Sequence, residues 1–140
     1  MGATEKSNTL LGMTLSVTTG WIPKYAADGS LYFSWAQATK PEVLLNVTFE
    51  HNATAVAEKD AWKAQTARQL RLKFEGNALT TAGTFTYKTL IIDLAGKWES
   101  FDTIGDMNGN DIVTGTFRAG YDATAAKFAE LTVVNETASY

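Results

Sequence analysis

The sequence predicts a mostly β protein, and two patterns carry that prediction. Short runs of residues alternate between apolar and polar side chains, and glycine, asparagine or aspartate residues separate these runs. One segment, in contrast, is rich in alanine and contains neither glycine nor proline. We therefore expect a β-sandwich or half-barrel with one flanking α-helix at about residues 54–67, formed by a single domain that spans residues 1–140.

Alternation with a period of two defines the expected strands. In the clearest one, Val43, Leu45 and Val47 point to one face of a sheet, and the residues between them point to the other. Asn108-Gly109 tolerates positive φ and is expected to form a hairpin turn. The expected strands are residues 11–18, 31–35, 43–50, 70–75, 85–94, 98–103, 111–121 and 128–135, with breaks at Gly83 and at Ala95-Gly96.

The alanine-rich segment has the charge polarity of a helix. Asn52 or Thr54 can cap its N-terminus, and Lys63 and Arg68 lie towards its end, where the helix dipole favours cations. This segment is therefore expected to separate two strands of the sheet.

A long aromatic-rich loop is expected at about residues 20–40. Gly20, Pro23 and Asp28-Gly29 interrupt the strand pattern there. Large aromatic side chains in such a loop suit a core and an interface better than they suit sugar stacking.

Residues 89–92 are apolar on both faces of their expected strand. Either a neighbouring subunit or a helix or loop of the same chain has to cover the outward face. The expected subunit interface comprises Trp21, Ile22, Tyr25, Tyr32, Trp35, Leu90, Ile91 and Ile92.

The composition argues against several classes of function. The 140-residue chain has a net charge of −3, which disfavours tight binding to nucleic acid through phosphate contacts. It has no cysteine, so disulfides and thiolate metal sites are excluded. The start of the chain lacks the apolar region of a signal peptide, and no apolar run is long enough to cross a membrane.

Candidate catalytic and ligand sites are weak. The stretch 106–111 offers oxygen ligands, but its spacing is wrong for a calcium loop and favours a turn. His51 is the only histidine, and Asp93, Glu99 and Asp102 are close only in sequence. No glycine-rich phosphate loop is present, so we expect no catalytic residue, metal or cofactor.

Three segments of the C-terminal half resemble bacteriophage tail tube (major tail) proteins. They are Lys88 to Gly96, then Asp106 to Asp111 leading into Ile112 to Phe117, and finally Leu131 to Glu136. The resemblance covers about residues 43–136 and includes the helix between two strands.

The resemblance implies a structural virion protein without enzymatic activity. Its sheets would join those of neighbouring copies into closed rings, usually hexamers, and stacked rings would form a conduit for DNA. The loop at 20–40 would contact the neighbouring ring. Other implied partners are the tape measure and other tail proteins, with DNA passing through the lumen without sequence-specific binding. The implied location is the virion tail, after assembly in the host cytoplasm, with no membrane association.

An alternative class stays open at this point. A monomeric β-sandwich binding module, such as a carbohydrate-binding, adhesion or decoration domain, would use Trp21, Trp35 and Tyr25 as a stacking platform.

Overall fold

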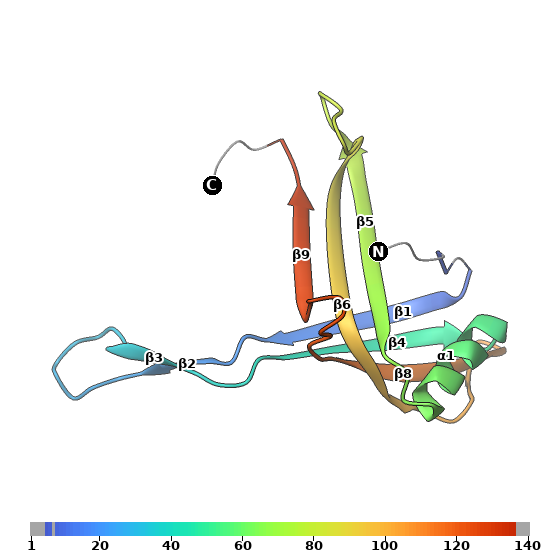
Figure 1. Ribbon diagram of the computed structural model, residues 1–140, viewed down its shortest axis with the longest axis horizontal. Helices are drawn as coiled ribbons and strands as arrows, with labels where there is room; N and C mark the ends of the chain where they lie inside the picture. The colour runs from blue at the N-terminus through green and yellow to red at the C-terminus, as the bar shows by residue number, and fades with distance from the viewer. Residues whose placement is uncertain (1–4, 7, 137–140) are drawn as a thin grey trace.

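A computed structural model describes residues 5–6 and 8–136 of the chain. Within these residues it contains one helix and nine strands (Figure 1). The elements are β1 (Leu10–Thr18), β2 (Trp21–Lys24), β3 (Trp35–Ala38), β4 (Glu42–Glu50), α1 (Ala53–Lys63), β5 (Arg68–Ala78), β6 (Tyr87–Phe101), β7 (Gly105–Met107), β8 (Asn110–Ala119) and β9 (Ala129–Val134).

Seven strands form one curled antiparallel sheet with the order β1-β4-β8-β6-β5. The short β7 pairs with β8, and β9 pairs with β6. Figure 1 shows β1, β4 and β8 crossing β5, β6 and β9 steeply, so that the sheet forms a half-barrel with α1 at one end. The prediction of a mostly β half-barrel with one flanking helix is confirmed.

The long strand β6 belongs to both halves of the sheet. Its residues 96–101 pair with β8, and its residues 89–94 pair with β9. The expected break at Ala95-Gly96 is wrong, because β6 continues through it. A Cβ atom at Gly96 would lie 2.2 Å from the carbonyl oxygen of Arg118, so glycine here permits close approach of β8.

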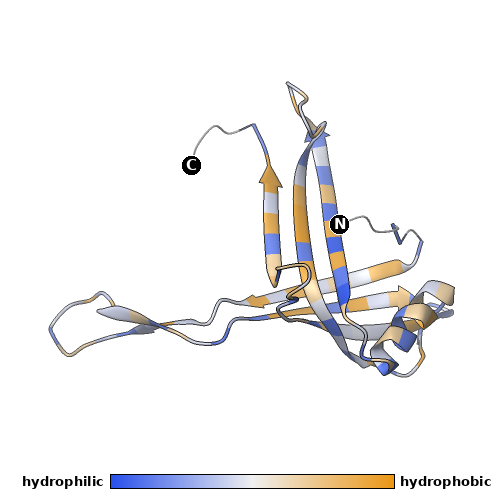
Figure 2. Cartoon of the chain, viewed as in Figure 1, coloured by the Kyte–Doolittle hydropathy of each residue, from blue (hydrophilic) through white to orange (hydrophobic). Residues whose placement is uncertain are grey.

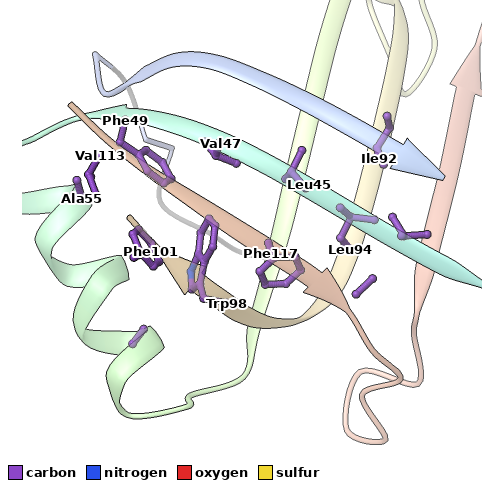
Figure 3. Packing of buried hydrophobic residues seen from close by; sticks show 13 residues of the cluster. Leu45, Val47, Phe49, Ala55, Ile92, Leu94, Trp98, Phe101, Val113 and Phe117 are labelled. Atoms are coloured by element: carbon purple, nitrogen blue, oxygen red, sulfur yellow. The ribbon is translucent and has the colours of Figure 1, made fainter. Parts of the chain in front are cut away.

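The core lies in the concave side of the half-barrel. Trp98, Phe117, Leu45, Leu94 and Val113 are its largest fully buried side chains. The Trp98 and Phe117 rings pack edge to face at 5.3 Å, and Figure 3 shows them converging. Each such side chain contributes about 1.5–3 kcal/mol by leaving water.

Helix α1 begins as the sequence predicts but ends earlier. Asn52 Oδ1 accepts hydrogen bonds from the backbone amides of Thr54 and Ala55, at 3.0 and 3.2 Å. The expected end at residue 67 is wrong, because α1 ends at Lys63. Gln65 adopts a φ of 53°, the left-handed conformation that closes a helix.

The segment expected as a loop at about 20–40 contains a two-stranded hairpin. Strands β2 and β3 pair from Trp21↔Ala38 to Lys24↔Trp35, and Figure 1 shows them projecting from the half-barrel. The expected strand at 31–35 is wrong, because β3 begins at Trp35. Asp28 Oδ1 accepts a hydrogen bond from the backbone amide of Ser30 at 2.9 Å, which forms a local turn in the connection between β2 and β3.

The predicted hairpin turn at Asn108-Gly109 is confirmed. Both residues have positive φ, 55° and 85°, and they join β7 to β8. Two consecutive positive φ values match the twist of an antiparallel pair.

Candidate subunit interface

The hairpin of residues 21–38, here called the aromatic hairpin, presents large apolar side chains to solvent. Trp21 is 63% exposed and Trp35 is 57% exposed. The others are Ile22, Tyr25, Leu31, Tyr32 and Phe33. A two-stranded ribbon has no core of its own, so these side chains have nothing in the hairpin to bury them.

The two tryptophans lie on opposite faces of the aromatic hairpin. Trp21 is paired with Ala38, whereas Trp35 is paired with Lys24, three residues further along β2. Because side chains alternate along a strand, an odd separation places them on opposite faces. One flat ligand therefore does not stack on both indoles, and a partner on each face is needed to cover them.

A second apolar surface lies across β5, β6 and β9. In one transverse row Phe74 pairs with Leu90, which pairs with Val133. In the next row Leu72, Ile92 and Leu131 are aligned in the same way. We call these two lines the apolar rows, and Figure 2 shows the alternating hydrophobic and hydrophilic bands of β5 and β9 that produce them.

The apolar rows are covered only in part. Ile92 belongs to the core cluster, and Leu72 and Leu90 pack partly buried against it. Phe74 is 43% exposed, and Leu131 and Val133 are each 63% exposed. The rows therefore carry exposed apolar side chains on the two outer strands, β5 and β9, with the half-buried Leu90 of β6 between them.

The structure separates the expected interface residues into two groups. The five in the aromatic hairpin are exposed, whereas Ile91 and Ile92 are buried within the single chain and Leu90 is half-buried. Ile91 lies on the face opposite the apolar rows, between Lys73 and Thr132. Ile91 is only 7% exposed in the single chain, so its burial does not require a second copy.

Sequence reasoning missed Phe74, Leu131 and Val133 as surface residues. Each is the apolar member of an alternating strand, and that pattern alone is typical of a core position. Their exposure follows from the pairing of β5 and β9 with β6, which places these residues at the outer strands of the sheet.

The face of this sheet opposite the apolar rows is polar and paired. Arg71 donates two hydrogen bonds to Asp93, at 2.7 and 2.6 Å. These bonds lower the pKa of the buried Asp93 carboxyl below its ordinary value. The Lys73 ammonium lies 2.7 Å from the Glu75 carboxylate.

The carboxylates weighed for catalysis do not form one site. Asp93 is held by Arg71, whereas Glu99 accepts hydrogen bonds from Arg118 at 3.1 and 2.9 Å. Asp102 is exposed at the end of β6. Among residues 5–6 and 8–136, no group of three or more histidine, cysteine or carboxylate side chains could hold a metal ion.

Two further observations bear on ligands and membranes. A surface depression lies beside Arg118 and the loop at Tyr121 to Thr124, and neither Trp21 nor Trp35 lines it. The helix within the described part of the chain is too short to span a membrane.

Comparisons with protein-family profiles and with curated sequences give no match.

Proposed function

We propose that this chain is a structural virion protein, a tail tube subunit that self-assembles into stacked rings forming a conduit for DNA. The observation that carries the proposal is the aromatic hairpin, which projects from the half-barrel with exposed indoles on both faces. A monomeric protein that exposes such a ribbon would aggregate without order, whereas a subunit buries it between copies.

Burial of the exposed aromatic side chains would offset much of the free-energy cost of association. Each of Trp21, Tyr25, Tyr32 and Trp35 is more than half exposed. Burial of each would contribute about 2–3 kcal/mol, on the order of 10 kcal/mol together. This is comparable to the cost of about 4–15 kcal/mol for ordering two molecules into one complex.

The proposal includes the partners and location implied by the resemblance. The subunit binds copies of itself, and the finished tube contacts the tape measure and other tail proteins. DNA passes without specific binding, which suits a chain with a net charge of −3. Assembly takes place in the host cytoplasm, and the product is the tail of the virion.

The test is removal of the two indoles. Purified wild-type protein is expected to form rings or tubes in negative-stain microscopy as its concentration rises. The Trp21→Ser/Trp35→Ser variant is expected to stay monomeric by light scattering and to melt at the temperature of dilute wild-type protein, because neither indole is in the core. Tyr121→Ser is the matched control, since Tyr121 is equally exposed but lies outside the hairpin.

The outcomes separate the tube subunit from the rival binding module. Wild-type protein that stays monomeric at all concentrations and salts, and in the presence of tail-tip initiators, would refute the proposal. Glycan-array binding that disappears in Trp35→Ala, with folding retained, would support the rival instead.

A further inference from the structure

An open depression in the surface lies beside the end of β8. Residues 96–99 of β6 and residues 118–124 line most of it, and its volume is about 700 Å³. This volume is within the range of sites that hold small ligands. No residue of the aromatic hairpin or of the apolar rows lines the depression, so it is distinct from both of those surfaces.

Hydrogen bonds fix the backbone of the loop that forms one rim of the depression. The Gly120 amide donates to the Ala95 carbonyl at 2.9 Å, and Asp122 and Lys127 exchange two backbone hydrogen bonds, at 2.9 and 3.2 Å. Tyr121 lies between these two anchored positions, and it is 71% exposed. The rim is therefore preformed, and it carries an aromatic ring that the chain itself leaves uncovered.

Strand register places two cations next to each other in the depression. Lys97 of β6 is the direct cross-strand partner of Arg118 of β8, and like charges in this position repel each other. Arg118 holds two carboxylates, that of Glu99 at 2.9 Å and that of Glu42. Lys97 forms no ion pair within the part of the chain that the structure describes.

Lys40 is a second cation of the depression without a carboxylate partner. It is exposed, lies just before β4, and forms no ion pair with any described residue. The carboxylate of Asp122, which also lines the depression, accepts hydrogen bonds from the amides of Thr124 and Ala125. Two lysines are thus left to attract an anion.

From these charges and the exposed ring, we infer that the depression binds an acidic peptide segment of another protein. One carboxylate of the segment pairs with Lys40 and Lys97, and an apolar neighbour packs against Tyr121. The carboxylates of Glu99 and Asp122 favour a single anion over a run of phosphates, which they would repel. The inference goes beyond the proposed function and does not depend on self-assembly.

The test uses a capped tripeptide, N-acetyl-leucyl-glutamyl-leucine amide, and its counterpart with glutamine in place of glutamate. The two differ by one charge only. Ligand-observed saturation-transfer NMR with the wild-type chain measures both affinities, whether the protein is monomeric or assembled. The acidic peptide is expected to bind at least about threefold more tightly at low salt. The difference should shrink at about 0.5 M salt, because screening weakens exposed charge pairs.

Three variants identify the groups that bind the peptide. Lys40→Gln/Lys97→Gln is expected to weaken binding of the acidic peptide about three- to tenfold and to leave the glutamine peptide unaffected. Lys59→Gln is the matched control, because Lys59 is also without an ion pair but lies on α1, outside the depression. Tyr121→Ser should weaken both peptides equally, because the ring contacts the apolar neighbour. Circular dichroism confirms that each variant is folded.

Each contrary result overturns the inference. Equal affinity for the two peptides, or acidic-peptide binding that survives Lys40→Gln/Lys97→Gln, shows that the lysines bind no carboxylate. Inorganic phosphate that displaces the acidic peptide at equal concentration shows a simple anion site. Binding that is lost when the wild-type protein assembles shows that a neighbouring copy occupies the depression. Wild-type protein that never assembles but binds the acidic peptide overturns the tube function and leaves this inference standing.

Discussion

Gly96 shows how one missing side chain permits the curl of the sheet. The carbonyl oxygen of Arg118 and the Cα atom of Ala119 would lie 2.2 and 2.9 Å from a Cβ atom there. These are backbone atoms and cannot rotate aside. We expect Gly96→Ala to lower the free energy of unfolding by about 1–3 kcal/mol in urea denaturation. Gly12→Ala, where no atom lies within 4 Å, is the control, and equal losses in both variants would contradict the explanation.

Asp93 stabilises the fold through its ion pair with Arg71. We expect Asp93→Asn to lower the free energy of unfolding by about 2 kcal/mol at pH 7, because it removes a charge-assisted pair with Arg71. The pKa of Asp93 is lowered in the folded state, so its contribution is present above the unfolded pKa of about 3.9 and is lost as the pH falls below it.

The wild-type and Asp93→Asn stabilities should therefore differ most above about pH 5 and converge in acid. Chemical denaturation at several pH values measures this difference. Asp102→Asn, at an exposed carboxylate, controls for the general effect of removing one negative charge. A difference between wild type and Asp93→Asn that stays constant down to pH 3 would show that the Arg71 pair is not its source.

At the scale of elements, helix α1 depends on its N-cap. We expect Asn52→Ala to cost about 1 kcal/mol, because the amides of Thr54 and Ala55 lose their acceptor. Asn52→Asp keeps a carboxylate acceptor at the same place and should keep most of the stability. Thermal unfolding followed by circular dichroism compares the two, and equal losses would contradict a capping role.

The elements also show what sequence patterns can and cannot predict. Alternation located β4 because one of its faces is buried, and β1 because Met13 and Leu15 pack partly buried against the same core. Asn108-Gly109 located a turn because its backbone needs positive φ. The break expected at Gly96 was wrong because glycine there serves packing against another strand. The helix end was missed because Gln65 adopts a conformation that usually indicates glycine.

The sequence predicted only part of the candidate interface. Trp21 and Trp35 stand out because they are large aromatic residues in a segment that glycine and proline interrupt. Phe74 and Val133 do not stand out, because a local pattern cannot tell whether an apolar face is covered by its own chain. Cover depends on where β1, β4 and β8 cross the other strands, which is a property of the tertiary fold.

At the scale of the whole molecule, stability should depend on protein concentration. In the proposed assembly the aromatic hairpin is buried between copies, and a partner that binds only the folded state stabilises it by about 2.7 kcal/mol at a hundredfold excess over the dissociation constant. We expect the midpoint of thermal unfolding to rise by about 5–10 °C between dilute and concentrated protein. Tryptophan fluorescence should shift to the blue at the same concentrations, because Trp21 and Trp35 leave water while Trp98 is buried throughout. The Trp21→Ser/Trp35→Ser variant should lose both effects, and a concentration-dependent midpoint that survives in this variant would mean that other surfaces hold the copies together.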